Sequence, residues 1–163
     1  MRKFAVLLGL LMLAPMAAHA QRFDLFGGYT YEQLDQPDGN AHTSGWATSI
    51  TYKFNPYLGL SGAFRGNYGT LFNESASLHG FYVGPQLSLP IRYSPFVHVL
   101  VGDRRLSMPT LEKSAFSTEV GGGLDILVKP YMSIRAIEGD IVTGNIYPTS
   151  SHSRLCFGVV FHF

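Results

Sequence analysis

Apolar and polar residues alternate along most of the chain beyond residue 20, and Gly, Pro and Asn separate the alternating runs. An alternation with a period of two is typical of β-strands that have one apolar face. No segment in this part repeats its apolar residues at helical spacing. The pattern predicts eight consecutive strands, near residues 22–32, 45–54, 57–66, 77–89, 94–104, 114–128, 131–143 and 151–163.

The connections between these strands alternate between short and long. Short turns are expected near 54–58, 89–95 and 128–132, whereas longer polar stretches cover 33–44, 67–76, 105–113 and 144–150. In an up-and-down meander, all short turns then lie at one end with both ends of the strand series, and all long loops lie at the other. This asymmetry is typical of outer-membrane barrels, which have short periplasmic turns and longer external loops.

Each strand has one apolar and one more polar face. The last strand shows both, with Leu155, Phe157, Val159, Phe161 and Phe163 on one face and Arg154, Cys156, Gly158, Val160 and His162 on the other. Alternation alone does not decide which face is inside. A soluble lipocalin-like barrel also has eight strands and turns its apolar face inward.

Three features indicate that the apolar face is outside. Aromatic residues such as Trp46 and Phe54 lie at both ends of the apolar faces, as in the girdles at two membrane interfaces. The charged faces are rich in Gly, Ser and Ala, which fill a narrow interior without crowding it. The strands are also about 9–13 residues long, which matches the roughly 9–11 residues that a tilted strand needs to cross the hydrocarbon. The sequence therefore predicts an all-β fold, an eight-stranded antiparallel up-and-down transmembrane β-barrel, closed because an open edge cannot be satisfied in lipid.

Charged residues occupy the predicted inward faces. Buried charges are normally paired, so these side chains are expected to form a lumen charge network, and a proton or ion relay is the alternative. The interior of an eight-stranded barrel is only just wide enough for side chains to fill it. No open pore is therefore expected, and a narrow channel stays an alternative. The residues of the expected network are Asp24, Lys53, Arg65, Glu119, Asp125, Arg135, Glu138, Asp140 and Arg154.

Two strands carry residues that a regular strand does not accommodate. In the strand near 131–143, Arg135 has one parity and Glu138 and Asp140 have the other. A one-residue bulge near Ile137 would turn all three side chains inward. Pro85 lies inside another strand, where it cannot donate to the ladder, so a bulge or a local break in pairing is expected there.

The turn before the irregular strand sets its register. If residues 129–131 form a three-residue loop, Val128 pairs with Met132 and Asp125 lies directly opposite Arg135 as an inward ion pair. The two acids beyond the bulge then face glycines, in the pairs Glu138 with Gly123 and Asp140 with Gly121.

Residues 1–20 have the features of a secretory signal peptide, with a basic start, an apolar run and a small-residue cleavage pattern at 18–20. Cleavage leaves one outer-membrane β-barrel domain over 21–163. Two of the 12 basic residues precede the cleavage point, so ten remain against 11 acidic residues. This balance provides no basic stripe for nucleic acid. The single Cys156 excludes an intrachain disulfide, and a free buried thiol is expected.

Several short stretches carry a family resemblance when they are taken together. They are FGGYTY near the first strand, FNPYLGLSGAF, VGGGLD, SIRAIEGD and the ending Gly158-x-x-Phe161-x-Phe163. The set resembles the small bacterial outer-membrane β-barrel family related to the OmpA transmembrane domain and OmpX, and the ending is similar to the C-terminal assembly signal of such proteins. The resemblance implies a monomer in the lipids of the bacterial outer membrane of a Gram-negative-type cell, inserted by the outer-membrane barrel assembly machinery.

An outer-leaflet lipid A-modifying enzyme is an alternative with the same fold. Ser151, His152 and Ser153 lie near the external end of the last strand. The histidine and the serines point to opposite faces of a regular strand, and no acid follows to orient the histidine. No catalytic residue is therefore assigned, and no enzyme is expected. His98 and His162 share the inward face but lie on non-adjacent strands without ligand spacing, so neither a metal nor a cofactor is expected.

Apolar residues interrupt the polar stretches that are expected to form external loops. They provide either an adhesive surface for a host or surface ligand, or packing above the barrel rim, and both interpretations stay open. The expected role is structural or surface interaction, with a soluble secreted lipid-binding barrel as a further alternative. These apolar residues are Phe72, Leu106, Met108, Leu111, Ile146 and Tyr147.

Overall fold

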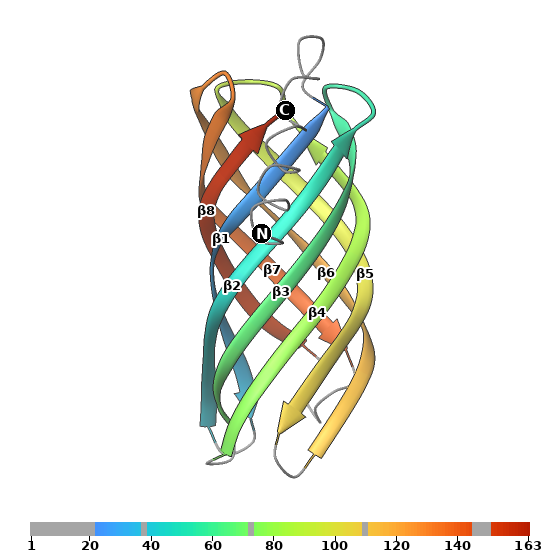
Figure 1. Ribbon diagram of the computed structural model, residues 1–163, viewed down its shortest axis with the longest axis vertical. Coiled ribbons are helices and arrows are strands. Elements are labelled where there is room, and N and C mark those ends of the chain that lie inside the picture. Colours follow the sequence, from blue (N-terminus) through green and yellow to red (C-terminus); the bar gives the residue numbers. More distant parts are fainter. Residues whose placement is uncertain (1–21, 37–38, 72–73, 109–110, 145–150) are drawn as a thin grey trace, which may run out of the picture.

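The computed structural model describes residues 22–36, 39–71, 74–108, 111–144 and 151–163. Each strand pairs antiparallel with the next, and β1 also pairs with β8, so the sheet is a closed barrel (Figure 1). This confirms the predicted fold class. Among the described residues, no helix is long and apolar enough to cross a membrane. The strands are β1 Phe23–Gln36, β2 Gly39–Lys53, β3 Leu58–Leu71, β4 Glu74–Ser88, β5 Tyr93–Met108, β6 Leu111–Lys129, β7 Met132–Gly144 and β8 Ser151–His162.

The two ends of the barrel differ, but less than the sequence predicted. The start of β1, the end of β8 and the turns at 54–57, 89–92 and 130–131 lie at one end, called here the terminal end (Figure 1). At the opposite end, most of the stretches expected to be long loops belong to strands. For example, β1 continues to Gln36 and β2 begins at Gly39.

The long-loop prediction was therefore wrong for most of 33–44, 67–76 and 105–113. The physical reason is that the closed barrel continues its backbone hydrogen bonds beyond the apolar zone, where outward side chains face water and need not be apolar. Polar composition does not distinguish a loop from a strand with two polar faces. Residues 37–38, 72–73, 109–110 and 145–150 lie outside the described residues.

The outside of the barrel is apolar, as β5 illustrates. Val97, Val99 and Val101 point outward and are between 41% and 57% exposed, whereas the alternating residues Phe96 and Leu100 are buried inside. A continuous apolar surface of this kind is rare on soluble monomers. It runs around all strands as an apolar belt, which includes Leu25, Tyr29, Ile50, Leu60, Phe64, Phe81, Val83, Val99, Val101, Val120, Ile134, Ile141, Leu155 and Phe157.

A bulge in β7 brings its charges to the inside, as predicted. Asp125 of β6 pairs with Arg135, while Leu124 pairs with Ile137, so Ala136 is the extra residue. Beyond the bulge, both acids of β7 face glycines, in the pairs Glu138 with Gly123 and Asp140 with Gly121. The expected register is thereby confirmed.

The β6–β7 turn differs in detail from the prediction. Lys129 pairs with Met132 and Leu127 pairs with Ser133, which leaves a two-residue turn and makes Val128 an extra residue. The predicted pairing of Val128 with Met132 was therefore wrong. The later register is unchanged because a two-residue turn followed by a one-residue bulge takes up as many residues as a three-residue loop.

Pro85 interrupts the ladder without shifting it. On one side it pairs with Leu60 of β3. On the other side, the β4–β5 ladder has partners at Val83 and Gln86 but not at Pro85, and the register is the same before and after this gap. The interruption is a local break in pairing rather than a bulge, because proline has no N–H to donate.

Candidate functional site

The centre of the lumen is organised around Arg65 of β3. Its Nη2 lies 2.7 Å from Glu119 Oε1 of β6 and 2.8 Å from Glu138 Oε1 of β7. Asp140 Oδ2 lies 3.9 Å from the same nitrogen. Since β3 is not a neighbour of β6 or β7 in the sheet, these ion pairs cross the interior.

A second arginine links the same acids to β8. Arg154 contacts Glu119 through Nη2, and its Nε lies 3.3 Å from Asp140 Oδ2. The side chain of Arg154 is almost completely buried. Asp140 in turn fills the space beside Gly121, where an added Cβ would lie 2.0 Å from Asp140 Oδ1. The acidic groups are therefore held between two arginines with little free room.

A third arginine lies nearer the terminal end. Arg135 makes two hydrogen bonds to Asp125, of 2.8 and 2.9 Å, and lies 2.5 Å from Glu138. Its guanidinium is also between two rings, 4.3 Å from the centroid of Phe26 and 4.1 Å from that of Phe96. Stacking of a guanidinium on aromatic faces adds to the ion pairs in a site removed from water.

The mouth of the lumen at the terminal end has its own polar group. Asp24 Oδ2 lies 2.7 Å from Lys53 Nζ, and Asp24 Oδ1 lies 2.6 Å from His162 Nδ1. The other ring nitrogen of His162, Nε2, lies 2.7 Å from Ser133 Oγ. These residues line a pocket of about 430 Å³. The structure thus places all nine residues of the expected lumen charge network inside the barrel and in ion pairs.

A further buried ion pair, which was not predicted from the sequence, lies at the opposite end. Glu32 of β1 lies 2.5 Å from Arg104 of β5 and also accepts a hydrogen bond from Asn67. Glu32 and Arg104 were the last residues of their expected strands, and the polar residues beyond were interpreted as loops. Their inward parity, which continues that of Asp24 and His98, was the signal that could have found them.

Four buried side chains lie close enough to one another to hold a metal ion. One ligand atom from each of His98, Glu119, Glu138 and Asp140 lies within 4.8 Å of the others. His98 Nε2 is 3.0 Å from Asp140 Oδ1 and 3.6 Å from Glu119 Oε1. The contacts of Arg65 and Arg154 with the same carboxylates already supply cationic partners, so the arrangement fits a charge network better than a metal centre.

The serine–histidine cluster of the last strand does not converge. His152 points inward and is buried, whereas Ser153 is exposed on the outside. The side chain of Ser151 lies outside the described part. The opposite orientation of histidine and serine agrees with the strand geometry expected from the sequence. His98 and His162 both point inward, as expected, but have different partners.

The interpretation of six apolar residues as an external loop surface was wrong for Leu106. This side chain points into the lumen from β5 and is 1% exposed, because the strand continues through the expected loop. Met108 and Leu111 also belong to strands. Phe72, Ile146 and Tyr147 lie outside the described residues, as does the expected signal peptide at 1–20.

The residues of the expected assembly signal lie at the seam between β1 and β8. Phe161 and Phe163 are exposed on the outside, and Gly158 pairs with Gly28 across the seam. The backbone of Phe163 exchanges two hydrogen bonds with Phe23, of 2.8 and 3.1 Å. These contacts close the barrel at its terminal end.

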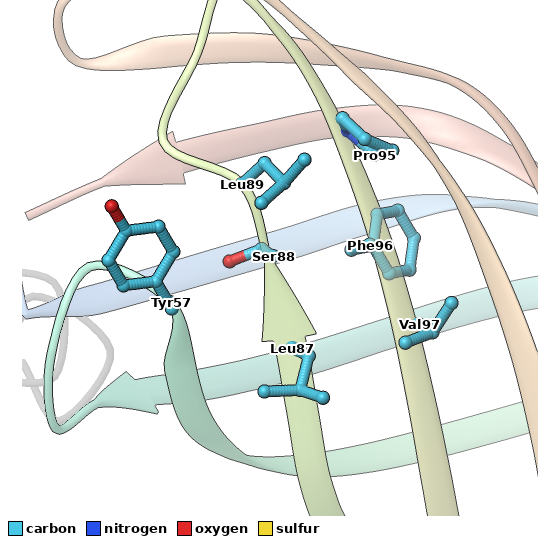
Figure 2. A pocket seen from close by; sticks show the side chains of 7 residues that line it. All are labelled: Tyr57, Leu87, Ser88, Leu89, Pro95, Phe96 and Val97. Carbon is cyan, nitrogen blue, oxygen red and sulfur yellow. The ribbon is translucent and has the colours of Figure 1, made fainter.

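An apolar groove of about 360 Å³ lies at the rim of the terminal end. Figure 2 shows Tyr57 on one side, the end of β4 in the centre and the start of β5 on the other side. Its lining offers hardly any polar atoms, so it suits an acyl chain better than a polar ligand. The lining residues are Tyr57, Leu87, Ser88, Leu89, Pro95, Phe96 and Val97.

No protein-family model and no curated protein sequence matches the chain. Similar solved structures exist. Ail, the attachment invasion locus protein of Yersinia pestis, is 16% identical, with a TM-score of 0.62 over 88% of this chain and 100% of Ail. Neisserial surface protein A is 13% identical, with a TM-score of 0.69 over 86% of this chain and 97% of its own. The N-terminal β-barrel domain of Pseudomonas aeruginosa OprF is 11% identical, with a TM-score of 0.58 over 88% of this chain and 98% of that domain.

At these identities the similarity establishes the fold, that of small bacterial outer-membrane barrels. It supports the resemblance inferred from the sequence and the outer-membrane location that the resemblance implied. Ail has also been solved in complex with the heparin analogue sucrose octasulfate.

Proposed function

We propose that this chain is a closed integral outer-membrane barrel with a structural or surface-interaction role, which neither conducts ions through an open pore nor modifies lipid at its external end. The observation that carries the proposal is the combination of the apolar belt outside with ion pairs that cross the lumen inside. The belt and the apolar rim groove are suited to lipid. The ion-paired side chains occupy the space in the lumen that water would fill in a pore.

The surface role rests on the end opposite the terminal end, which we expect to face outward. Strands continue there beyond the apolar belt and carry exposed polar side chains, so the barrel presents a rigid, water-exposed collar. Of the side chains described in that region, the collar includes His42, Asp103, Arg105, Ser107, Glu112 and Lys113. Backbone hydrogen bonding between strands gives such a surface a fixed shape for contact with a partner.

The composition of the collar does not favour a polyanion like the one bound to Ail. Asp103 and Glu112 offset Arg105 and Lys113, and Arg105 forms an ion pair with Glu112. A sulfated ligand needs an excess of positive charge. The partner class proposed for this chain is therefore a neutral or mixed-charge surface.

The absence of lipid modification at the external end is proposed from the orientation of His152. This residue is buried in the lumen and Ser153 faces outward. A serine nucleophile needs a base within hydrogen-bonding distance, and these two neighbours do not meet that requirement.

The proposal predicts that the folded protein in planar lipid bilayers gives no steady conductance of porin size. Barrels with aqueous channels have about 16–18 strands, and an eight-stranded interior is filled by side chains. The recordings should use protein that has been shown to insert into liposomes by a flotation assay. A lack of current then cannot be explained by a failure to insert. A large, stable, ion-selective current would contradict the closed lumen and favour the channel alternative.

A further inference from the structure

The pocket at the mouth of the lumen, at the terminal end, contains a chain of hydrogen bonds that runs from Ser133 through His162 to Asp24. Ser133 Oγ lies 2.7 Å from His162 Nε2, and His162 Nδ1 lies 2.6 Å from Asp24 Oδ1. Since a carboxylate only accepts hydrogen bonds, Nδ1 of the neutral ring carries the proton, and Nε2 is left to accept the serine hydroxyl proton. This is the order of atoms required for a serine nucleophile, its base and the group that orients the base.

The three residues come from strands that are neighbours in the closed barrel. His162 of β8 pairs directly with Asp24 of β1. Ser133 of β7 pairs with Val160, two positions before His162 on the same inward face of β8. The arrangement therefore depends on closure of the barrel, and no single segment of the sequence contains it.

Asp24 is fixed from a second side. Its Oδ1 contacts His162 while its Oδ2 lies 2.7 Å from Lys53 Nζ. The carboxylate thus uses one oxygen for each partner and holds the imidazole ring in one orientation. A serine with a purely structural role could donate its hydroxyl proton to a backbone carbonyl. The hydroxyl of Ser133 is instead directed to the basic nitrogen of the oriented imidazole ring.

The pocket provides space beside the serine hydroxyl. Its volume of about 430 Å³ is within the usual range of ligand pockets, roughly 300–1,000 Å³. Leu127 and Pro130 contribute apolar wall, and Gln86 and Lys53 contribute N–H donors suited to negative charge on a carbonyl oxygen. Arg92, which also lines the pocket, is exposed and can attract an anionic substituent.

We propose that Ser133, His162 and Asp24 form a hydrolytic site for small carboxylic esters at the terminal end of the lumen, with Ser133 as nucleophile, His162 as base and Asp24 as positioning residue. The inference goes beyond the structural role proposed above and departs from the expectation that the chain is not an enzyme. It concerns the opposite end of the barrel from His152.

The reaction takes place in two steps. Ser133 Oγ forms a bond to the ester carbonyl carbon while its proton passes to His162 Nε2; the bond between this carbon and the alcohol oxygen then breaks, and the alcohol leaves with that proton. In the second step, water gives a proton to His162 Nε2 and attacks the acyl-serine. The acid is released, and the proton returns to Ser133 Oγ.

A fluorophosphonate probe on the full chain folded in detergent tests this inference. We expect covalent labelling that maps to Ser133 by mass spectrometry, is lost in Ser133→Ala, and is slowed by about 10²-fold or more in His162→Gln, as for loss of a general base. Asp24→Asn should slow labelling while Ser133 remains the labelled residue. Ser61→Ala is the matched control, because Ser61 is also buried in the lumen but accepts a hydrogen bond from Thr51, whereas Ser133 donates one to a histidine.

Heat-modifiable electrophoretic mobility shows that each variant is folded. Ser133→Ala removes a single oxygen atom and keeps the test decisive if His162→Gln fails to fold. The inference is overturned if folded wild type is labelled no more than Ser133→Ala, or if labelling of Ser133 is as fast in folded His162→Gln; the hydrogen-bond chain is then structural only. Either result leaves the closed outer-membrane barrel intact, since that proposal is tested by insertion and conductance.

Discussion

Val99→Arg is expected to impair stable insertion of the barrel into a membrane. Val99 points outward from β5, is 47% exposed and pairs with Val120, another residue of the apolar belt. An arginine facing lipid near the bilayer midplane costs about 2–4 kcal/mol. This is a large part of the total stability of about 5–15 kcal/mol that is usual for a folded domain. The folded, heat-modifiable fraction after refolding into liposomes measures the effect.

Ser107→Arg is the matched control for this substitution. Ser107 lies on the same strand and the same outward face as Val99, but beyond the apolar belt in the polar collar. The lipid-facing cost falls to about 0–1 kcal/mol near the interface, so Ser107→Arg should insert like the wild type. Equal insertion of the two variants would show that the exterior of β5 does not contact lipid.

Arg65→Met is expected to cause the largest loss of stability among single changes in the lumen. Arg65 is the common partner of Glu119 and Glu138, and all three side chains are nearly or fully buried. Methionine keeps much of the length but removes the charge, so that Glu119 keeps only Arg154 and Glu138 keeps only Arg135 as an arginine partner. Breaking a buried ion pair on one side costs about 3–5 kcal/mol. Urea unfolding of the protein in lipid vesicles measures the change in the free energy of unfolding.

The chain provides a control for the same substitution at an exposed ion pair. Arg105 pairs with Glu112, and both side chains are more than half exposed. Exposed pairs contribute about 0.2–1 kcal/mol, so Arg105→Met should change stability little. Adding Glu138→Gln to Arg65→Met should recover part of the loss, because it removes one of the two buried carboxylates that have lost Arg65 as a partner. Similar losses for Arg65→Met and Arg105→Met would mean that the lumen pairs are hydrated.

The sequence allowed prediction of the features that depend on strand parity. With a side-chain period of two, the apolar and polar faces of β8 can be assigned without a structure. The bulge that turns Glu138 inward followed from the requirement that these charges avoid lipid, and the pairing of Asp125 with Arg135 followed from the expected length of the turn. Such predictions concern neighbouring strands, whose relation is fixed by the turn between them.

Contacts across the lumen could not be predicted in the same way. The pair of Arg65 with Glu138 and that of Glu32 with Arg104 join strands that are not adjacent. Their partners depend on the tilt and stagger of the closed barrel, which strand parity does not specify. The site at Ser133 depends on the seam between the first and last strands and was missed for the same reason. Polar strands beyond the apolar belt were also missed, because composition alone does not distinguish them from loops.

The most direct test of a lipid-facing exterior is the accessibility of spin labels placed along one face of β5. The label is attached to single cysteines that replace Val97, Val99, Val101 or Ser107 in a Cys156→Ser background, and each labelled protein is folded into liposomes. Electron paramagnetic resonance then compares how often the label collides with oxygen and with a water-soluble nickel complex. The structure predicts that labels at the three valines collide mainly with oxygen dissolved in lipid, whereas the label at Ser107 collides mainly with nickel. Nickel-accessible labels at the valines would place the exterior in water and contradict a membrane-spanning barrel.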